Sequence, residues 1–368
     1  MSDRPAPPRL AARAVLAARV SLERLGDRLL PAELATLQRS IGFAPAFTMR
    51  ALAELEIPEA LDKQKTRTAE DIAREKGLDA DALHRVMRYA ALHGLLKLDK
   101  RGRFKLTRTG AVLKKEHPHS MRPWILYLTE RSTQEAWQNV TDSVRTGEPA
   151  FPATHGESVW SYFEKHPREE QQFAAGMRRI TEIDLPSIVA GYPWPETGTV
   201  CDVAGGIGTL LTGVLKKRPQ LKGILVDGPG VLNEAEAHLA AEGVRDRVEL
   251  CEGNFFESVT ATADVYVMKD VLHDWDDERC LQILETVRKA MPSGSRLVLV
   301  ETLQEPNVVE PVASFVDVHM LTQTDGGRQR SVKELHDLMR GADLEPGEVR
   351  LTANPGLIEG IASASRPT

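Results

Sequence analysis

The sequence predicts an α/β protein in which a parallel sheet, covered on both faces, follows an all-helical and winged-helix-like amino-terminal region. From residue 196 onward, short apolar strands alternate with helical stretches, which is typical of parallel strands joined by helices. Before that point, apolar residues recur mainly at helical spacing. The 368 residues also exceed the length of one ordinary domain, so we expect at least two.

The amino-terminal region has the pattern of several helices followed by a winged helix. The stretch "TAEDIAREKG" begins with the helix-capping residues Thr68 and Asp71 and ends at Gly77, and a second helix ends at Gly94. The alternation in "LLKLDKRGRFKLTRTG" then predicts a small hairpin. Helix, turn, helix and hairpin together predict a winged-helix segment.

Three segments are expected along the chain. Residues 1–118 are helical and winged-helix-like, and residues 119–195 are mostly helical and end in the linker "GYPWPETG", where prolines stop the helix. Residues 196–368 form the sheet. Its expected strands are "TVCDVA", "KGILVD", "RVELCEG", "ADVYVMK", "RLVLVET" and "GLIEGIA".

Composition narrows the class of protein. A net charge of −6 indicates no general affinity for nucleic acid. The three cysteines are far apart and form no C-x-x-C pair, which argues against a zinc site or a disulfide framework. No apolar run approaches the roughly 20 residues that cross a bilayer, and the first residues lack the apolar core of a signal peptide. We therefore expect a cytoplasmic protein that binds neither membrane nor nucleic acid.

A glycine-rich turn follows the first strand, in "VCDVAGGIGTLL". Asp202 ends the strand, and Gly205 and Gly206 allow a ligand to approach the backbone at the start of a helix. The dinucleotide fingerprint needs a small residue where Leu211 stands, so a pyrophosphate-binding turn is disfavoured.

Polar and aromatic residues follow the next two strands. Asp227 ends the second strand, where a ribose-binding carboxylate is expected. Asn254 and Phe255 follow the third strand, where an amide can pair with adenine and a ring can pack on the base. The pattern predicts a ligand with ribose and base.

These features resemble class I S-adenosylmethionine-dependent methyltransferases, whose sheet is Rossmann-like. The stretch "MKDVLHDWDDE" is similar to the signature of small-molecule O-methyltransferases of the caffeic-acid and hydroxyindole type, including a bacterial antibiotic-tailoring branch. The likeness continues in "HGESVWSYFEKHP", "FAAGM", "DVAGGIG", "GNFF" and "TDGGRQRS". It implies a homodimer through the amino-terminal helices, a substrate-lining middle segment and S-adenosylmethionine as cofactor.

The resemblance also implies cofactor contacts. They are Asp202, Gly205, Gly206, Asp227, Asn254, Phe255 and Lys269, with Trp275 beside the adenine.

His273 is the candidate catalytic base. It follows the fourth strand, at the edge where ligands of parallel sheets bind. A neutral imidazole can take the proton of a phenol as its oxygen attacks the sulfonium methyl group, a step that needs no metal. Asp274 is the candidate substrate contact beside it, although carboxylates at this point also serve the start of the next helix.

The resemblance suggests partners for His273. Glu301 ends the fifth strand, and Gln329 stands where many relatives have glutamate, so one carboxylate that would stabilise an imidazolium is missing. Met177 and Met320 match positions that hold an aromatic substrate, although methionine is also ordinary core filler. We expect methylation of a phenolic hydroxyl on an aromatic secondary metabolite.

Three alternatives remain. The chain could bind the cofactor and perform altered, non-methylating chemistry, or sense the cofactor without catalysis. The basic hairpin could bind DNA, but Asp79 and Asp81 begin the helix that would enter the groove, and their charge repels phosphate.

Overall fold

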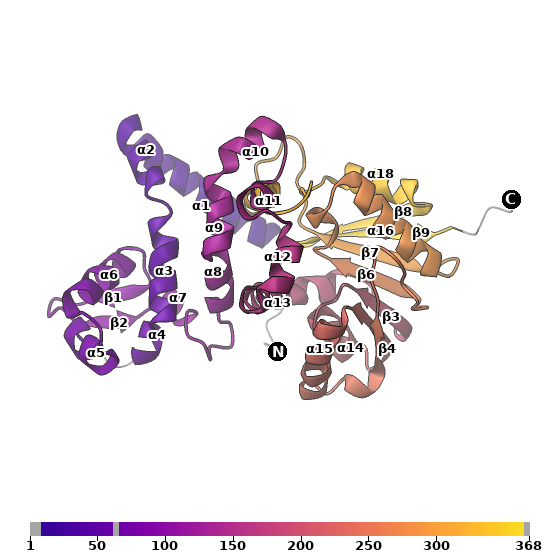
Figure 1. Ribbon diagram of the computed structural model, residues 1–368, viewed down its shortest axis with the longest axis horizontal. Coiled ribbons are helices and arrows are strands. Elements are labelled where there is room, and N and C mark those ends of the chain that lie inside the picture. Colours follow the sequence, from indigo (N-terminus) through magenta and orange to yellow (C-terminus); the bar gives the residue numbers. More distant parts are fainter. Residues whose placement is uncertain (1–8, 62–65, 364–368) are drawn as a thin grey trace. The chain divides into compact units, whose positions relative to one another are not determined.

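The structure is a computed structural model that describes residues 9–61 and 66–363 (Figure 1). Its contacts divide these residues into two compact units. The sheet unit holds residues 9–16, 135–162 and 181–363, and the helical unit holds residues 17–134 and 163–180. The segment boundaries expected at residues 118 and 195 stay predictions.

The helical unit contains the predicted winged-helix pattern. Thr68 accepts a hydrogen bond from the Asp71 amide at 3.2 Å, and Gly77 ends the helix with a φ of +68°. In the hairpin, Leu96 pairs with Leu106. The elements are α2 (Ala32–Ser40), α3 (Ala44–Glu54), α4 (Ile57–Ala60), α5 (Ala69–Lys76), α6 (Ala80–Leu92), β1 (Leu96–Leu98), β2 (Phe104–Leu106), α7 (Arg108–Ala111) and α8 (Arg122–Leu128).

Several helices have residues in both units or belong to the sheet unit alone. Those with residues in both are α1 (Arg9–Arg28), α9 (Arg131–Gln138), α12 (Val159–Lys165) and α13 (Pro167–Gly191). The helices α10 (Val140–Thr146), α11 (Ala150–His155) and α17 (Pro311–Gln323) lie in the sheet unit, where α10 and α11 contact α17.

The sheet has seven strands in the order β5-β4-β3-β6-β7-β9-β8. They are β3 (Thr197–Val203), β4 (Gln220–Asp227), β5 (Val248–Glu252), β6 (Val265–Lys269), β7 (Arg296–Glu301), β8 (Leu344–Leu351) and β9 (Gly356–Ala362). The first five strands of this order are parallel, as predicted. Strand β9, expected from "GLIEGIA", runs antiparallel to β7 and pairs with β8, which the sequence analysis missed. The sheet is therefore mixed, because β8 and β9 are joined by a short turn without a crossover helix.

Helices cover both faces of the sheet (Figure 1). On one face, α16 (Asp277–Ala290) and α18 (Val332–Gly341) pack on Tyr266 and Met268. On the other face, α14 (Thr209–Lys217) and α15 (Pro229–Ala241) pack on Val265 and Val267, together with the end of α13. Alternate residues of β6 thus enter opposite cores, which explains why this central strand is apolar throughout.

Two short 3-10 helices complete the unit, η1 (Arg245–Arg247) and η2 (Leu272–Asp274). The second follows β6 directly and holds His273 at the carboxyl edge of the parallel strands. Among the residues that the structure describes, no helix has the length and apolar character needed to span a membrane.

Candidate active site

The glycine turn after β3 is closed on its protein side and open at its tip. Asp202 is 1% exposed and accepts a hydrogen bond from the Leu211 amide at 3.3 Å. A Cβ added to Gly205 would lie 2.5 Å from the Asp202 Cγ, so only glycine fits there. Gly206 has a φ of +59°, and a Cβ built on it would meet nothing within 4 Å.

Hydrogen bonds connect the glycine turn to Asp227 at the end of β4. The Gly206 amide donates to Asp227 Oδ2 at 2.8 Å, and the Gly228 amide donates to Asp227 Oδ1, also at 2.8 Å. Burial raises the pKa of Asp227, and it raises the pKa of Asp202 to about 7. Ala204 has a φ of +56°, which is a conformation that favours glycine.

The side chains predicted to hold adenine lie in an aromatic cluster. Phe255 and Phe256 make edge contacts with Trp275, at ring-centroid distances of 6.4 Å and 4.8 Å, and Trp160 stacks on Trp275 at 5.8 Å. The sequence analysis missed Phe256 and Trp160, although "GNFF" and "VWSYF" display them. Asn254 is engaged in its own turn, because its Oδ1 accepts from the Phe256 amide at 3.0 Å and its Nδ2 donates to Glu257 at 3.2 Å.

Lys269, the last residue of β6, is buried among carboxylates. Its side chain is 6% exposed and forms ion pairs with Asp270 and with Asp184 of α13. Burial opposes the charged amine, but the two carboxylates raise the pKa of Lys269 above its ordinary value. Lys269 therefore stays positively charged, and Asp184 is a partner that the sequence analysis missed.

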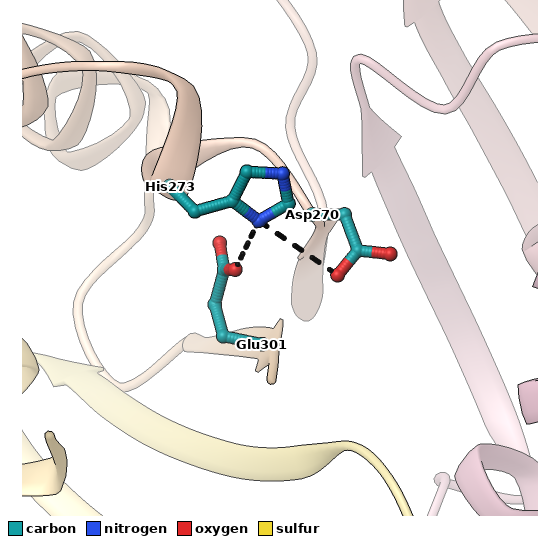
Figure 2. Close-up of side chains that lie close together, drawn as sticks. All are labelled: Asp270, His273 and Glu301. Atoms are coloured by element: carbon teal, nitrogen blue, oxygen red, sulfur yellow. Dashed lines mark hydrogen bonds and ion pairs between the residues drawn. The ribbon is translucent and has the colours of Figure 1, made fainter. Parts of the chain in front are cut away.

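His273 is oriented by Glu301, as Figure 2 shows. The imidazole Nδ1 lies 2.9 Å from Glu301 Oε2. The other oxygen of Glu301 accepts hydrogen bonds from the amides of Val271 and Leu272, at 3.3 Å and 3.0 Å. Glu301 is 3% exposed, so the end of β7 holds both the ring and the backbone of η2 in place.

Two further carboxylates surround the ring. Asp270 Oδ1 lies 4.0 Å from Nδ1 (Figure 2), and Asp274 Oδ1 lies 3.5 Å from Nε2. Burial opposes the imidazolium, but the charges of Asp274, Glu301 and Asp270 together raise the pKa of His273 to about 10. Burial raises the pKa of Asp274 to about 7. The neutral imidazole expected from the sequence is therefore not the favoured form at neutral pH, because neighbouring carboxylates supply the negative charge that Gln329 does not.

The side chain of Gln329 is buried without a partner. The residue is 4% exposed, and neither its side-chain oxygen nor its side-chain nitrogen has a hydrogen-bond partner, although its backbone amide donates to Asp317 at 2.9 Å. A buried polar group left unpaired costs about 1 to 3 kcal/mol, so this amide suits a polar ligand group.

Arg330 is a residue at this site that the sequence analysis missed. Its side chain is 2% exposed and donates to the carbonyl oxygens of Leu272 and Trp275, both at 2.7 Å. It also pairs with Asp277 at 2.8 Å. Arg330 thus holds η2 from both ends, and only the run of charges in "GGRQRS" hinted at this role.

The two predicted substrate methionines lie in different units. Met320 is 7% exposed on α17 in the sheet unit, and Met177 is half-buried on the helical-unit part of α13. Near Met320, three rings stack: Trp137, Phe315 and His319, with the Trp137 indole N–H donating to His319 Nδ1 at 2.9 Å. Burial and the charge of His273 lower the pKa of His319 to about 4, so this ring is neutral.

A divalent cation could reach three of these side chains. Ligand atoms of Asp270, His273 and Glu301 all lie within 4.8 Å of one another. Both oxygens of Glu301 already accept hydrogen bonds, from Leu272 and from His273. That no metal takes part in the reaction stays a prediction.

Comparison with known proteins decides the family. Residues 137–345 match the O-methyltransferase domain, and residues 37–116 match the O-methyltransferase dimerisation domain.

The chain belongs to the O-methyltransferase family.

Relatives of this O-methyltransferase include enzymes of antibiotic biosynthesis. It is 33% identical to a phenazine O-methyltransferase of Lysobacter antibioticus over 88% of this chain and 94% of the relative. The crystal structure of LaPhzM superimposes with a TM-score of 0.85 at 32% identity, covering 90% of this chain and 99% of that one. The O-methyltransferase NcsB1 from neocarzinostatin biosynthesis was solved with S-adenosyl-L-homocysteine and 1,4-dihydroxy-2-naphthoic acid. It has a TM-score of 0.74 at 31% identity and covers 86% of this chain and 95% of that one.

These comparisons confirm the Rossmann-like methyltransferase fold with an amino-terminal dimerisation domain, and they confirm S-adenosylmethionine as the cofactor. The residues of this O-methyltransferase fit that group. The backbone at Gly206 is open, and the buried carboxyl group of Asp227 lies beside it, where it can pair with hydroxyl groups.

Proposed function

We propose that this O-methyltransferase methylates an acidic aromatic hydroxyl of a small secondary metabolite and that His273 holds the proton of that hydroxyl. The pairing of His273 Nδ1 with Glu301 at 2.9 Å is the main support, because it leaves Nε2 as the atom that exchanges a proton with a substrate. S-adenosylmethionine supplies, when bound, an electrophilic methyl group on a positively charged sulfur. No metal is needed for this chemistry.

The raised pKa of His273 determines how it acts. Its pKa of about 10 matches that of a phenol, which is also about 10. An imidazolium beside a phenolate carries the same protons as a neutral imidazole beside a phenol, so the proton moves between them at little cost in free energy. His273 then stabilises the anionic oxygen by charge. An aromatic hydroxyl more acidic than phenol is favoured, because its anion already exists at neutral pH.

The other polar residues near His273 take supporting roles in this proposal. Glu301 orients the imidazole and stabilises its charge. Asp274, whose pKa of about 7 allows both protonation states, contacts the substrate. The unpaired amide of Gln329 donates to or accepts from a polar substituent of the substrate. Met320 holds the aromatic ring by thioether packing, and Met177 stays a predicted substrate contact.

For the cofactor we propose the contacts that the sequence predicts. Asp202, Gly205 and Gly206 form the turn against the cofactor, and Asp227 binds the ribose hydroxyls. Phe255, Trp275 and Lys269 line the same edge. Asn254 contacts the adenine amine, for which it exchanges the hydrogen bonds of its own turn.

We infer a homodimer formed through the amino-terminal helices. The matched dimerisation domain supports it, and so do exposed apolar side chains on α2 and α3 and between them. These are Leu34, Leu37, Ile41, Phe43 and Phe47, with exposures between 41% and 64%.

The alternatives are less well supported. DNA binding is disfavoured because the winged-helix segment belongs to a dimerisation domain and because Asp79 is used to cap α6, accepting from the Ala82 amide at 2.8 Å. Cofactor sensing without catalysis would not require the paired His273 and Glu301.

A panel of aromatic hydroxyl compounds tests the proposal. With labelled S-adenosylmethionine at constant pH, we expect kcat/KM to rise as the pKa of the hydroxyl falls from about 10 towards 7. Carboxylic acids and anilines of similar shape serve as controls for carboxyl and nitrogen methylation. Tight binding of S-adenosylhomocysteine with no transfer to any compound would instead support altered chemistry.

A further inference from the structure

Asp184 and Lys269 form a buried pair of opposite charges beside the glycine turn. Their side chains are 8% and 6% exposed, and the Lys269 Nζ lies 3.4 Å from Asp184 Oδ2. Charge-assisted hydrogen bonds are normally about 2.7 to 2.9 Å long, so this pair is loose.

The charge of Lys269 is balanced by a different residue. Asp270 lies closer to the Lys269 Nζ than Asp184 does. One ammonium thus faces two carboxylates, and burial raises the pKa of Asp184 to about 7 despite the charge of Lys269. Asp184 therefore keeps the capacity to accept a second cation.

The pair lies close to the turn that fits the cofactor. Lys269 ends β6, which pairs with β3 through Asp202 and Val267, and its charge acts on the carboxyl group of Asp202. On the other side, Leu185 packs against Gly213 of the helix that follows the turn, where an added Cβ would lie 2.5 Å from the leucine side chain. Asp184 precedes Leu185 on α13, and its carboxyl group pairs with Lys269, whose charge reaches Asp202 at the start of the turn.

We propose that Asp184 binds the α-ammonium group at the amino-acid end of the cofactor. That end carries an ammonium and a carboxylate on one carbon, and the protein presents a carboxylate and an ammonium in buried positions 3.4 Å apart. Asp184 and Lys269 complement the two charges of the ligand. The inference rests on S-adenosylmethionine as the cofactor and does not depend on the substrate or on His273.

The Asp184→Asn variant tests the proposal through binding alone. Isothermal titration calorimetry measures the Kd of two probes, S-adenosylhomocysteine and its deaminated analogue, in which hydrogen replaces the amino group. Wild-type protein is expected to prefer S-adenosylhomocysteine by about tenfold or more, since a hydrogen bond between charged groups is involved. The variant is expected to lose most of that preference, because its amide carries no charge.

Three results would overturn the proposal. Equal weakening of both probes in Asp184→Asn would make the residue a counter-ion of Lys269 only. Unchanged binding of both probes would exclude it from the site. A wild-type protein that binds the two probes equally would show that the ammonium group is not recognised by a charge.

Two controls make these results interpretable. Asp337→Asn removes an exposed carboxylate that pairs with Lys333, and both Kd values should equal those of the wild type. Thermal unfolding of Asp184→Asn shows that the variant is folded. Failure of wild-type protein to bind S-adenosylhomocysteine would count against the cofactor itself, whereas normal wild-type binding with an unaltered preference in the variant counts only against Asp184.

Discussion

Buried carboxylates have different charged neighbours in the two units. In the helical unit, the Glu130 side chain is 8% exposed and lies 3.3 Å from Arg50 and 3.2 Å from Arg168. Burial opposes its charge, but these cations and the Arg131 amide hold its pKa below the ordinary value. In the sheet unit, burial raises the pKa of Asp184 and Asp202 to about 7.

This difference in neighbouring charge distinguishes carboxylates that stabilise the fold from carboxylates that bind a ligand. A buried carboxylate between arginines joins helices and is ionised in the folded protein, and removing it leaves charges unpaired. The carboxyl groups at the sheet edge have too few cations around them, so their charge favours binding of a positively charged ligand. Burial alone does not identify a functional carboxylate; its balance of neighbouring charge does.

The largest effect is expected where charge serves the reaction. His273→Ala should lower kcat by about 10² to 10⁴-fold, because the anionic oxygen of the substrate loses the imidazolium that stabilises it. The Kd of S-adenosylhomocysteine should change little. His93→Ala, which alters an exposed histidine of the helical unit, is the matched control and should retain full activity. A His273→Ala enzyme with wild-type kcat would remove this residue from the mechanism.

Glu130→Gln tests the structural side of the comparison. The free energy of unfolding should fall by about 1.5 to 3 kcal/mol, because hydrogen bonds between charged groups are lost in a buried place. Urea unfolding measures this. Glu54→Gln removes another partner of Arg50, at 2.8 Å, but Glu54 is 48% exposed, and the loss should stay below about 1 kcal/mol.

The counterpart is Asp202→Asn in the sheet unit. The free energy of unfolding of this variant should equal or exceed that of the wild type, because the substitution removes a carboxyl group whose pKa is raised by burial. Equal losses of stability in Glu130→Gln and Asp202→Asn would contradict the distinction between the two regions.

The Arg330→Lys variant tests how the sheet edge positions His273. We expect kcat to fall by about tenfold while the KM for the cofactor is unchanged, since lysine cannot hold both carbonyl oxygens that flank His273. Arg328→Lys alters a 41% exposed neighbour that also pairs with Asp277, so it is the control. A rise in the cofactor KM with unchanged kcat would assign Arg330 to cofactor binding instead.

Stability should depend on pH through His273. The folded pKa of about 10 lies above the unfolded value of about 6.5, so the imidazolium contributes its full stability below pH 6.5 and loses it as the pH rises through 10. The difference in Tm between wild type and His273→Gln should shrink over this range. Each kcal/mol of unfolding free energy that the imidazolium loses should lower the wild-type Tm by about 2 to 4 °C. A constant difference from pH 6 to 10 would mean that the ring does not titrate there.

The smallest effect is expected from removal of metal ions. Dialysis against a chelator should change kcat by less than about twofold, since a proton acceptor and an electrophilic methyl group need no Lewis acid. Magnesium added back is the control. Activity lost on dialysis and recovered with magnesium would assign the Asp270, His273 and Glu301 cluster to a cation.

Local sequence signals determined the elements and the order of the site residues. These signals act over a few residues, so they can be recognised without knowing the fold. They include the helix caps Thr68 and Gly77, the glycines after β3 and the apolar strands. The parallel strand order then placed Asp202, Asp227, Lys269 and Glu301 at one edge. The "HDW" stretch indicated the family, which the comparisons confirmed.

Only the tertiary structure decided the charge state of the site. Glu301 meets His273 across 28 residues, and Arg330 reaches Leu272 across 58. Asp184 joins Lys269 from a helix that precedes the whole sheet. The pKa of a buried group depends on every charge within a few ångströms, and those neighbours come from distant parts of the chain. For that reason the sequence identified His273 as a candidate, whereas the fold determined which carboxylates raise its pKa.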